Sequence, residues 1–395
     1  FMVMQNMICA SGGIFLTQYF GAKQREGMRQ SVAFKVVASL STCIFYFLAT
    51  FVFTRPVLSL MVIGNSQAEL ILDEGQKYMY LMGFIGIQMM ISSILSSSYR
   101  EIGRVRVILV ITLIAAGSNA FLNWVFIYGH LGMPRLEVEG AAYATIIAKT
   151  VEMLLLIGYT IKERPEFISF SVFKRIDWAL FGRILKKGSL LIMSQMMWVL
   201  SESFTAAIYN GRGNAAVVSG MAASFSIANL FFISFDGITT ATGVLIGKSL
   251  GRNELDDARK EKTWMLSAAI IFGCIMCLVG VVTVLLVPVV FGNLSIDAQN
   301  ICRAMLLLMA LFMPLWTFVN TQLAVCRAGG DTKVGFLVDG GTTAVMIPML
   351  LILAFFTNAS PVMMYFGVKA LDVGKIIVAT HEMKKERWVV NLSNA

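Results

Sequence analysis

Long apolar runs recur from one end of the chain to the other and restrict it to one class of fold. A helix that crosses the hydrocarbon core of a membrane needs about 20 consecutive, mostly apolar residues. Hydrophobic residues make up 57% of the 395 and charged residues only 14%, so such runs can follow one another closely. We therefore predict an all-α polytopic membrane protein with eleven spans, at residues 1–20, 31–54, 76–98, 106–128, 138–161, 189–210, 215–247, 264–288, 304–326, 334–357 and 361–381.

The chain also carries the same landmarks twice, in the same order. The segment 13–29 returns at 243–259, an offset of 230 residues, and the segment 99–103 returns at 326–330, an offset of 227. Two homologous halves account for this nearly constant spacing. Because eleven spans do not divide equally, we expect twelve in the full-length protein, with one helix and about 40–50 residues absent before Phe1.

An even number of helices in each half has a consequence for topology. Both halves then start on the same side of the membrane, so the two six-helix bundles are parallel repeats about an axis along the membrane normal. We predict an N-terminal bundle over residues 1–161, a cytoplasmic linker over 162–188, a C-terminal bundle over 189–383 and a cytoplasmic tail over 384–395. A substrate path is expected between the bundles.

The basic residues indicate the orientation. Of the 32 Lys and Arg, 23 fall in loops on one side of the predicted spans, five on the other side and four inside spans. Cytoplasmic loops are enriched in Lys and Arg, so the basic loops and the C-terminus are predicted to be cytoplasmic, next to anionic lipid headgroups. The charge is spread over several short loops and forms no single basic patch, which argues against nucleic-acid binding.

Several short motifs carry a family resemblance. They are Gly140-Ala-Ala-Tyr-Ala-Thr145, Gly247-Lys-Ser-Leu-Gly251, Arg327-Ala-Gly-Gly-Asp-Thr-Lys333 and Lys384-Lys-Glu-Arg-Trp388. In this order, and with the two-fold repeat, the chain resembles the multidrug and toxic compound extrusion (MATE) family over essentially its whole length. The resemblance implies twelve helices in two six-helix bundles, and export of mostly cationic amphiphiles driven by inward Na⁺ or H⁺.

Three acids inside predicted spans are the first candidates for a site, since a charge at that depth costs about 2.5–3.5 kcal/mol on insertion scales. Glu202 lies near the middle of its span, and we predict that it is the main coupling carboxylate of the second half. Asp236 is a candidate either for ion binding or for structural hydrogen bonding. Asp339 lies closer to the cytoplasmic end of its span and is a third candidate for the coupling ion or the substrate.

Lysines inside the spans offer an alternative, in which an acid such as Glu202 is neutralised by a lysine of a neighbouring helix. Five residues also have the i,i+3 spacing of ion pairs within one helix: Lys149 with Glu152, and Asp372 with Lys369 and Lys375.

Three uncharged polar residues form a further candidate in the first half. Asn119 and Asn123 are four residues apart and share one face of a helix, and Thr145 lies on the next helix. The MATE resemblance implies a cation site here, because archaeal members have an Asn, an Asp and a Thr at the corresponding positions. This chain has Asn123 where those members have the Asp.

A third group is predicted to line a cavity for varied apolar cations, with packing or contact with lipid as the alternative for its methionines. It comprises Met193, Met197, Trp198 and Asn320.

These observations favour a secondary active antiporter of the cytoplasmic membrane that exports cationic amphiphiles in exchange for Na⁺ or H⁺. A flippase for lipid-linked saccharides is the alternative of the same architecture, and an intramembrane enzyme is the alternative of another class. No P-loop for ATP is present, and the two histidines, His130 and His381, suggest no metal centre. We therefore expect no cofactor apart from the coupling ion, and a monomer whose partners are small-molecule cationic substrates and membrane lipids.

Overall fold

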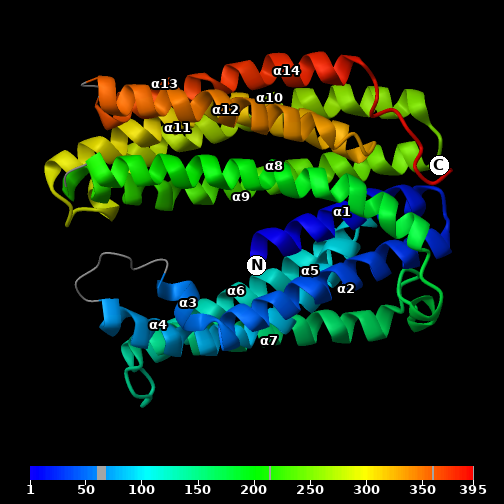
Figure 1. The fold of residues 1–395 in the computed structure, drawn as a ribbon, viewed down its shortest axis with the longest axis horizontal. Coiled ribbons are helices and arrows are strands. Elements are labelled where there is room, and N and C mark those ends of the chain that lie inside the picture. Colours follow the sequence, from blue (N-terminus) through cyan, green and yellow to red (C-terminus); the bar gives the residue numbers. More distant parts are fainter. Residues whose placement is uncertain (60–67, 213–214, 358–359, 395) are drawn as a thin grey trace. The chain divides into compact units, whose positions relative to one another are not determined.

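The computed structural model describes residues 1–59, 68–212, 215–357 and 360–394, and within them the chain is helical with no strand (Figure 1). Eight of the described helices are long and apolar enough to cross a membrane, or nine when one bent pair counts as a single span. The predicted all-α membrane fold is therefore confirmed. The helices of the first half are α1 (Met2–Gly21), α2 (Arg25–Phe47, extended by a π-helical segment, Leu48–Val52), α3 (Thr54–Ser59), α4 (Ala68–Gly83), α5 (Ile85–Glu101), α6 (Val105–Tyr128) and α7 (Glu137–Glu163). Those of the second half are α8 (Trp178–Arg212), α9 (Ala215–Gly251), α10 (Leu255–Val290), α11 (Ile296–Ala328), α12 (Lys333–Phe356), α13 (Pro361–Ala370) and α14 (Asp372–Lys384).

Several predicted spans differ in detail from the structure. The span predicted at 76–98 is bent by 44° between α4 and α5, and the span predicted at 361–381 is two helices that meet at Leu371. The helix predicted from residue 189 begins earlier, at Trp178, where the Asp177 carboxylate caps it by accepting from the backbone N–H of Leu180 at 3.0 Å. The charged residues of 178–188 lower the mean hydropathy of this first part of α8, so hydropathy does not predict it. Lys and Arg are nevertheless good helix formers.

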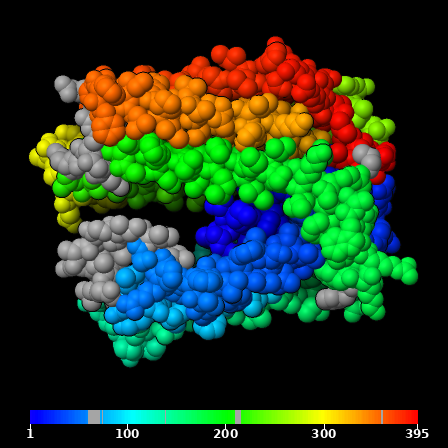
Figure 2. All heavy atoms as spheres, viewed as in Figure 1, coloured from blue at the N-terminus to red at the C-terminus, as the bar shows by residue number. Residues whose placement is uncertain are grey.

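The chain divides into two compact units, one of Phe1–Leu16 with Gln24–Ile184 and the other of Thr17–Lys23 with Leu185–Ala395. Within the second unit, α9, α10 and α11 pack along one another, and α12, α13 and α14 complete the bundle (Figure 1). In the space-filling view, α8 and the α12–α13 segment form one continuous outer surface of this unit (Figure 2). The four domain limits predicted from the sequence remain predictions.

The ends of corresponding helices repeat the same backbone geometry. After α1 and α9 the chain turns through a left-handed residue, Lys23 with φ 56° and Asn253 with φ 66°, and these positions are 230 apart. After α5 and α11 it turns through Gly103 with φ 86° and Gly330 with φ 76°, which are 227 apart. These are the offsets read from the sequence, so the repeat extends to the caps that end its helices.

One helix crossing in the second unit depends on glycine. A Cβ at Gly251 would overlap the backbone carbonyl of Gln18, and a Cβ at Gly21 would overlap that of Lys248. The two contacts are reciprocal at the repeat offset of 230, because residues 18 and 21 correspond to 248 and 251. Small residues permit such close backbone approach between membrane helices, which explains why both copies of the motif end in glycine.

Candidate functional site

Glu202 on α8 forms an ion pair with a lysine of another helix. The Nζ atom of Lys369 on α13 lies 2.6 Å from Glu202 Oε1, and the side chains are 13% and 27% exposed. The same ammonium lies over two aromatic rings, 5.7 Å from the centroid of Trp316 and 5.4 Å from that of Tyr365. The pairing anticipated as the alternative for Glu202 is therefore present. Lys369 forms this pair in place of the predicted i,i+3 pair with Asp372, which lies on the next helix and pairs with Lys375.

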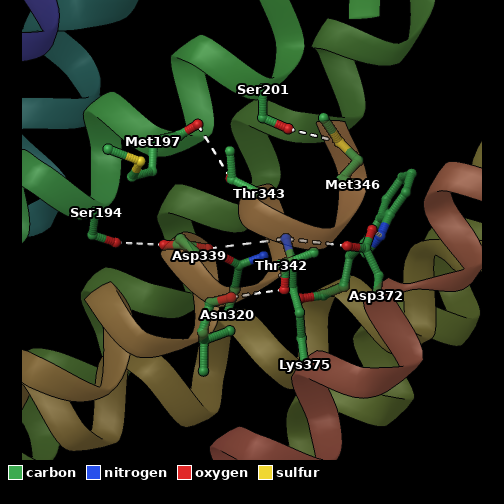
Figure 3. A network of polar contacts seen from close by, with 12 residues as sticks. Ser194, Met197, Ser201, Asn320, Asp339, Thr342, Thr343, Met346, Asp372 and Lys375 are labelled. Atoms are coloured by element: carbon green, nitrogen blue, oxygen red, sulfur yellow. Dashed lines mark hydrogen bonds and ion pairs between the residues drawn. The ribbon is translucent and has the colours of Figure 1, made fainter. Parts of the chain in front are cut away.

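Asp339 on α12 lies between α8 and α14 (Figure 3). Its carboxylate accepts a hydrogen bond from the Ser194 hydroxyl and lies 3.9 Å from the Nζ atom of Lys375. Lys375 is closer to Asp372, at 3.1 Å. Asp372 in turn accepts from the indole N–H of Trp316 at 2.8 Å. Lys375 thus pairs with two carboxylates, and its interaction with Asp339 is the longer and weaker of the two.

The break between α13 and α14 builds this arrangement. Leu371 separates Lys369, in the last turn of α13, from Asp372, in the first turn of α14. A carboxylate near a helix N-terminus is stabilised by the helix dipole, which suits a side chain as buried as Asp372, at 6% exposure. One turn later, Lys375 returns to the same face and completes the predicted i,i+3 pair with Asp372.

Asp236 on α9 is exposed, and its charge acts on Arg327 of α11 together with that of Asp339. Arg327 therefore joins the electrostatic environment of the cluster. The charged residues of this cluster are four carboxylates and three cations: Glu202, Asp236, Asp339 and Asp372, with Arg327, Lys369 and Lys375. If all are ionised, these seven residues carry a net charge of −1.

The polar residues predicted in the first unit are brought together. The Asn123 amide donates to Asn119 Oδ1 at 3.1 Å, and the Asn119 amide reaches Thr145 Oγ1 at 3.5 Å. The Asn123 Oδ1 atom is buried and makes no hydrogen bond within the described residues. The trio therefore presents one unused acceptor and no charge.

An ion pair around a fully buried lysine in the first unit was not predicted. The Lys35 ammonium on α2 contacts Glu101 Oε2 at 2.5 Å and the Ser97 and Ser98 hydroxyls at 3.1 and 3.2 Å, with no exposed side-chain surface. The only signal in the sequence is a lysine alone in an apolar run, and nothing in the spacing points to Glu101, which lies 66 residues away.

The other predicted residues have varied surroundings. Lys149 pairs with Glu152 at 2.7 Å, as the i,i+3 spacing predicted. Met193 and Trp198 are exposed on α8, and Met197 is half-buried. Asn320 donates to the backbone carbonyl of its own helix at 2.8 Å. Whether the last four side chains line a cavity remains a prediction.

Sequence reasoning missed Ser194, Trp316 and Tyr365, which hold the cluster from α8, α11 and α13. Each reads as an ordinary residue of an apolar helix, so no local signal could have identified it. Among the described residues, no group of three or more His, Cys, Asp or Glu is arranged to hold a metal ion.

Comparisons with known proteins agree with this architecture. The sequence profile of the MatE family matches residues 1–125 and 191–360. A probable multidrug resistance protein NorM of Listeria innocua is 23% identical over 389 residues, covering 96% of this chain and 83% of that protein. The NorM protein of Mesorhizobium japonicum is 26% identical over 291 residues, covering 71% of this chain and 61% of that protein. The match to this second relative therefore spans about three fifths of its length.

Solved structures resemble the fold as a whole. A mutant of the Vibrio cholerae MATE transporter VcmN superposes with a TM-score of 0.83 at 17% identity, covering 98% of this chain and 87% of the other. A MOP superfamily transporter from Pyrococcus furiosus, described as having a binding pocket of reverse polarity, gives 0.82 at 15% identity, with coverages of 98% and 85%.

Proposed function

Since the chain belongs to the MatE family, whose members are transporters and not enzymes, we propose that it is a multidrug efflux transporter, and specifically an antiporter of cationic amphiphiles against Na⁺ or H⁺. The names of its NorM relatives support the multidrug assignment. The charge cluster of the second unit supports the antiport assignment.

The unequal charge count carries the proposal. Excess negative charge in a membrane interior is unfavourable. Glu202, Asp339 and Asp372 share only two lysines, so the cluster has a lower energy when it binds one additional cation. A proton, a sodium ion or a cationic substrate can each supply that charge. If two of them exclude one another, binding of either weakens binding of the other, which is the coupling that antiport requires.

Asp339 is our proposed coupling carboxylate, in place of Glu202. Glu202 has a lysine of its own at 2.6 Å, whereas Asp339 lies 3.9 Å from a lysine that is closer to Asp372. The other charged groups around Asp339 are Arg327 on α11 and, through Arg327, Asp236 on α9. Of the carboxylates held on α8, α12 and α14, Asp339 is the one with the weakest ion pair.

The flippase alternative has less support. An anionic lipid-linked substrate calls for lysines or arginines that are free to bind it, and the four lysines inside the spans all have carboxylate partners. These pairs are Lys35–Glu101, Lys149–Glu152, Lys369–Glu202 and Lys375–Asp372.

Transport by the purified protein in sealed vesicles tests the proposal. A cationic dye would be followed under an imposed pH gradient and, separately, an imposed Na⁺ gradient. We expect one of the two to drive dye uptake into inside-out vesicles. Asp339→Asn should abolish gradient-driven uptake while dye binding in detergent remains.

Glu152→Gln is the matched control, because it removes an intramembrane acid whose lysine is in the same helix. It should transport normally. Gradient-driven uptake by Asp339→Asn at the wild-type rate would show that Asp339 is not the coupling carboxylate. Absence of uptake by the wild-type protein under both gradients would refute antiport.

We further propose that the protein is a monomer of the cytoplasmic membrane, with its basic loops and C-terminus on the cytoplasmic side next to anionic lipids. A reporter fused after Ala395 that fluoresces only in the cytoplasm should be bright. A dark reporter, with an equal amount of protein in the membrane, would contradict this orientation.

A further inference from the structure

The surroundings of Lys369 have the composition of a receptor for an organic cation. A carboxylate oxygen lies 2.6 Å from the ammonium, and the centroids of the Trp316 and Tyr365 rings lie 5.7 and 5.4 Å from it. Aromatic faces within about 6 Å attract an ammonium through the ring quadrupole. A negative charge combined with aromatic walls is the chemistry that recognises alkylammonium ligands.

The aromatic walls are held in place by their own neighbours. The Trp316 indole donates to Asp372 at 2.8 Å and stacks on Phe312 with centroids 5.7 Å apart. Tyr365 is 1% exposed and meets Phe225 edge-on at 6.3 Å. A site whose groups are already oriented loses little entropy when a ligand binds.

We propose that Lys369 is a tethered stand-in for the transported cation, and that a cationic amphiphile binds by displacing its ammonium from Glu202, Trp316 and Tyr365. This inference rests on the proposed function and names its substrate site. The four-carbon stem of lysine is flexible enough to move the ammonium away. Of the two paired side chains, Glu202 is more exposed than Lys369, at 27% against 13%, so a ligand can reach the carboxylate.

Lys369 also stabilises the transporter when no substrate is bound. Without a bound cation, Glu202 would be an isolated charge inside the membrane, which is unfavourable. Lys369 neutralises it whenever substrate is absent, and at the same time weakens substrate binding by competition. The two acids then have separate roles, with Glu202 for the substrate and Asp339 for the coupling ion.

Ethidium binding to the purified full chain in detergent tests the inference, read by fluorescence anisotropy at pH 8. Lys369→Met removes the competitor and should lower the ethidium Kd about tenfold, a difference of about 1.4 kcal/mol. Lys369→Arg keeps a competing cation and should bind like the wild type. The double variant Glu202→Gln with Lys369→Met removes both charges and should bind far more weakly than Lys369→Met.

Lys149→Met is the matched control, because it removes an intramembrane lysine of the other unit, and its ethidium Kd should not change. Melting temperatures measured on the same samples identify variants that fail to fold. If folded Lys369→Met binds ethidium as the wild type does, or more weakly, Lys369 is not a competitor.

Vesicle transport separates this outcome from failure of the proposed function. Gradient-driven ethidium uptake by the wild type, with unchanged binding to Lys369→Met, would refute the stand-in alone. Tighter binding to Lys369→Met without gradient-driven uptake by the wild type would refute antiport alone.

Discussion

Removing the charge of Lys35 should destabilise the protein strongly. The side chain is fully buried, and its ammonium contacts Glu101 at 2.5 Å as well as two serine hydroxyls. Lys35→Met keeps the length of the side chain but leaves Glu101, which is 13% exposed, as an uncompensated charge. Breaking a buried pair in this way costs about 3–5 kcal/mol. At about 2–4 °C per kcal/mol for a unit of this size, the Tm should fall by about 6–20 °C.

Thermal unfolding of the purified protein in detergent, followed by loss of the monodisperse peak, measures this change. The double variant Lys35→Met with Glu101→Gln removes both charges and should recover most of the loss, since a neutral replacement of a whole pair is often close to neutral. Lys260→Met is the control, because both side chains of its pair with Asp257 are exposed, at 66% and 55%, and such a surface pair contributes little to stability. If Lys35→Met melts no lower than Lys260→Met, or if the double variant is as unstable as the single one, the pair does not stabilise the fold.

Two further predictions concern the second unit. Gly251→Ala should lower the Tm because its Cβ meets the backbone of Gln18, whereas Gly243→Ala on the same helix meets nothing within 4 Å and should leave the Tm unchanged or raise it; equal shifts would contradict the close crossing. Asp331→Asn, in the loop between α11 and α12, should raise the Tm at pH 7, because burial raises the pKa of Asp331 above its ordinary value despite the opposing charges of Arg387 and Lys187. The folded state therefore binds the proton more tightly than the unfolded state, and the wild type gains stability as pH falls through that pKa. The difference in Tm between Asp331→Asn and the wild type should therefore shrink toward pH 4. A difference in Tm that stays constant with pH would contradict this prediction.

The sequence predicted the parts of the fold that depend on local pattern. Apolar length gives the membrane helices, and turn chemistry gives the positions where they end, as at Gly103 and Gly330. The breaks at Phe84 and Leu371 were missed because hydropathy continues across them. A window average registers the loss of apolar residues and not the loss of a helical hydrogen bond.

The candidate site was only partly predictable, for a different reason. Acids at mid-span mark Glu202 and Asp339 as costly residues, and helical spacing pairs Lys375 with Asp372. The partner of Glu202 is 167 residues away, and only the packing of α13 against α8 selects Lys369 from the lysines at similar depth. Pairing between helices is a property of the bundle and leaves no trace in local spacing.

The internal repeat supports the view that the Lys35–Glu101 pair functions as a unit. At the offsets of 230 and 227, Lys35 corresponds to Met265 and Glu101 to Ala328. One copy of the repeat thus carries both charges and the other carries neither, although the turns that flank these positions are the same in both. A buried pair is tolerable when complete and an apolar pair is tolerable as well, whereas one charge without the other is not. In the second copy the intramembrane lysines are Lys369 on α13 and Lys375 on α14, and three carboxylates pair with these two lysines. The first copy therefore holds a complete pair at these positions, and the proposed cation site belongs to the second copy, where carboxylates outnumber the lysines that pair with them.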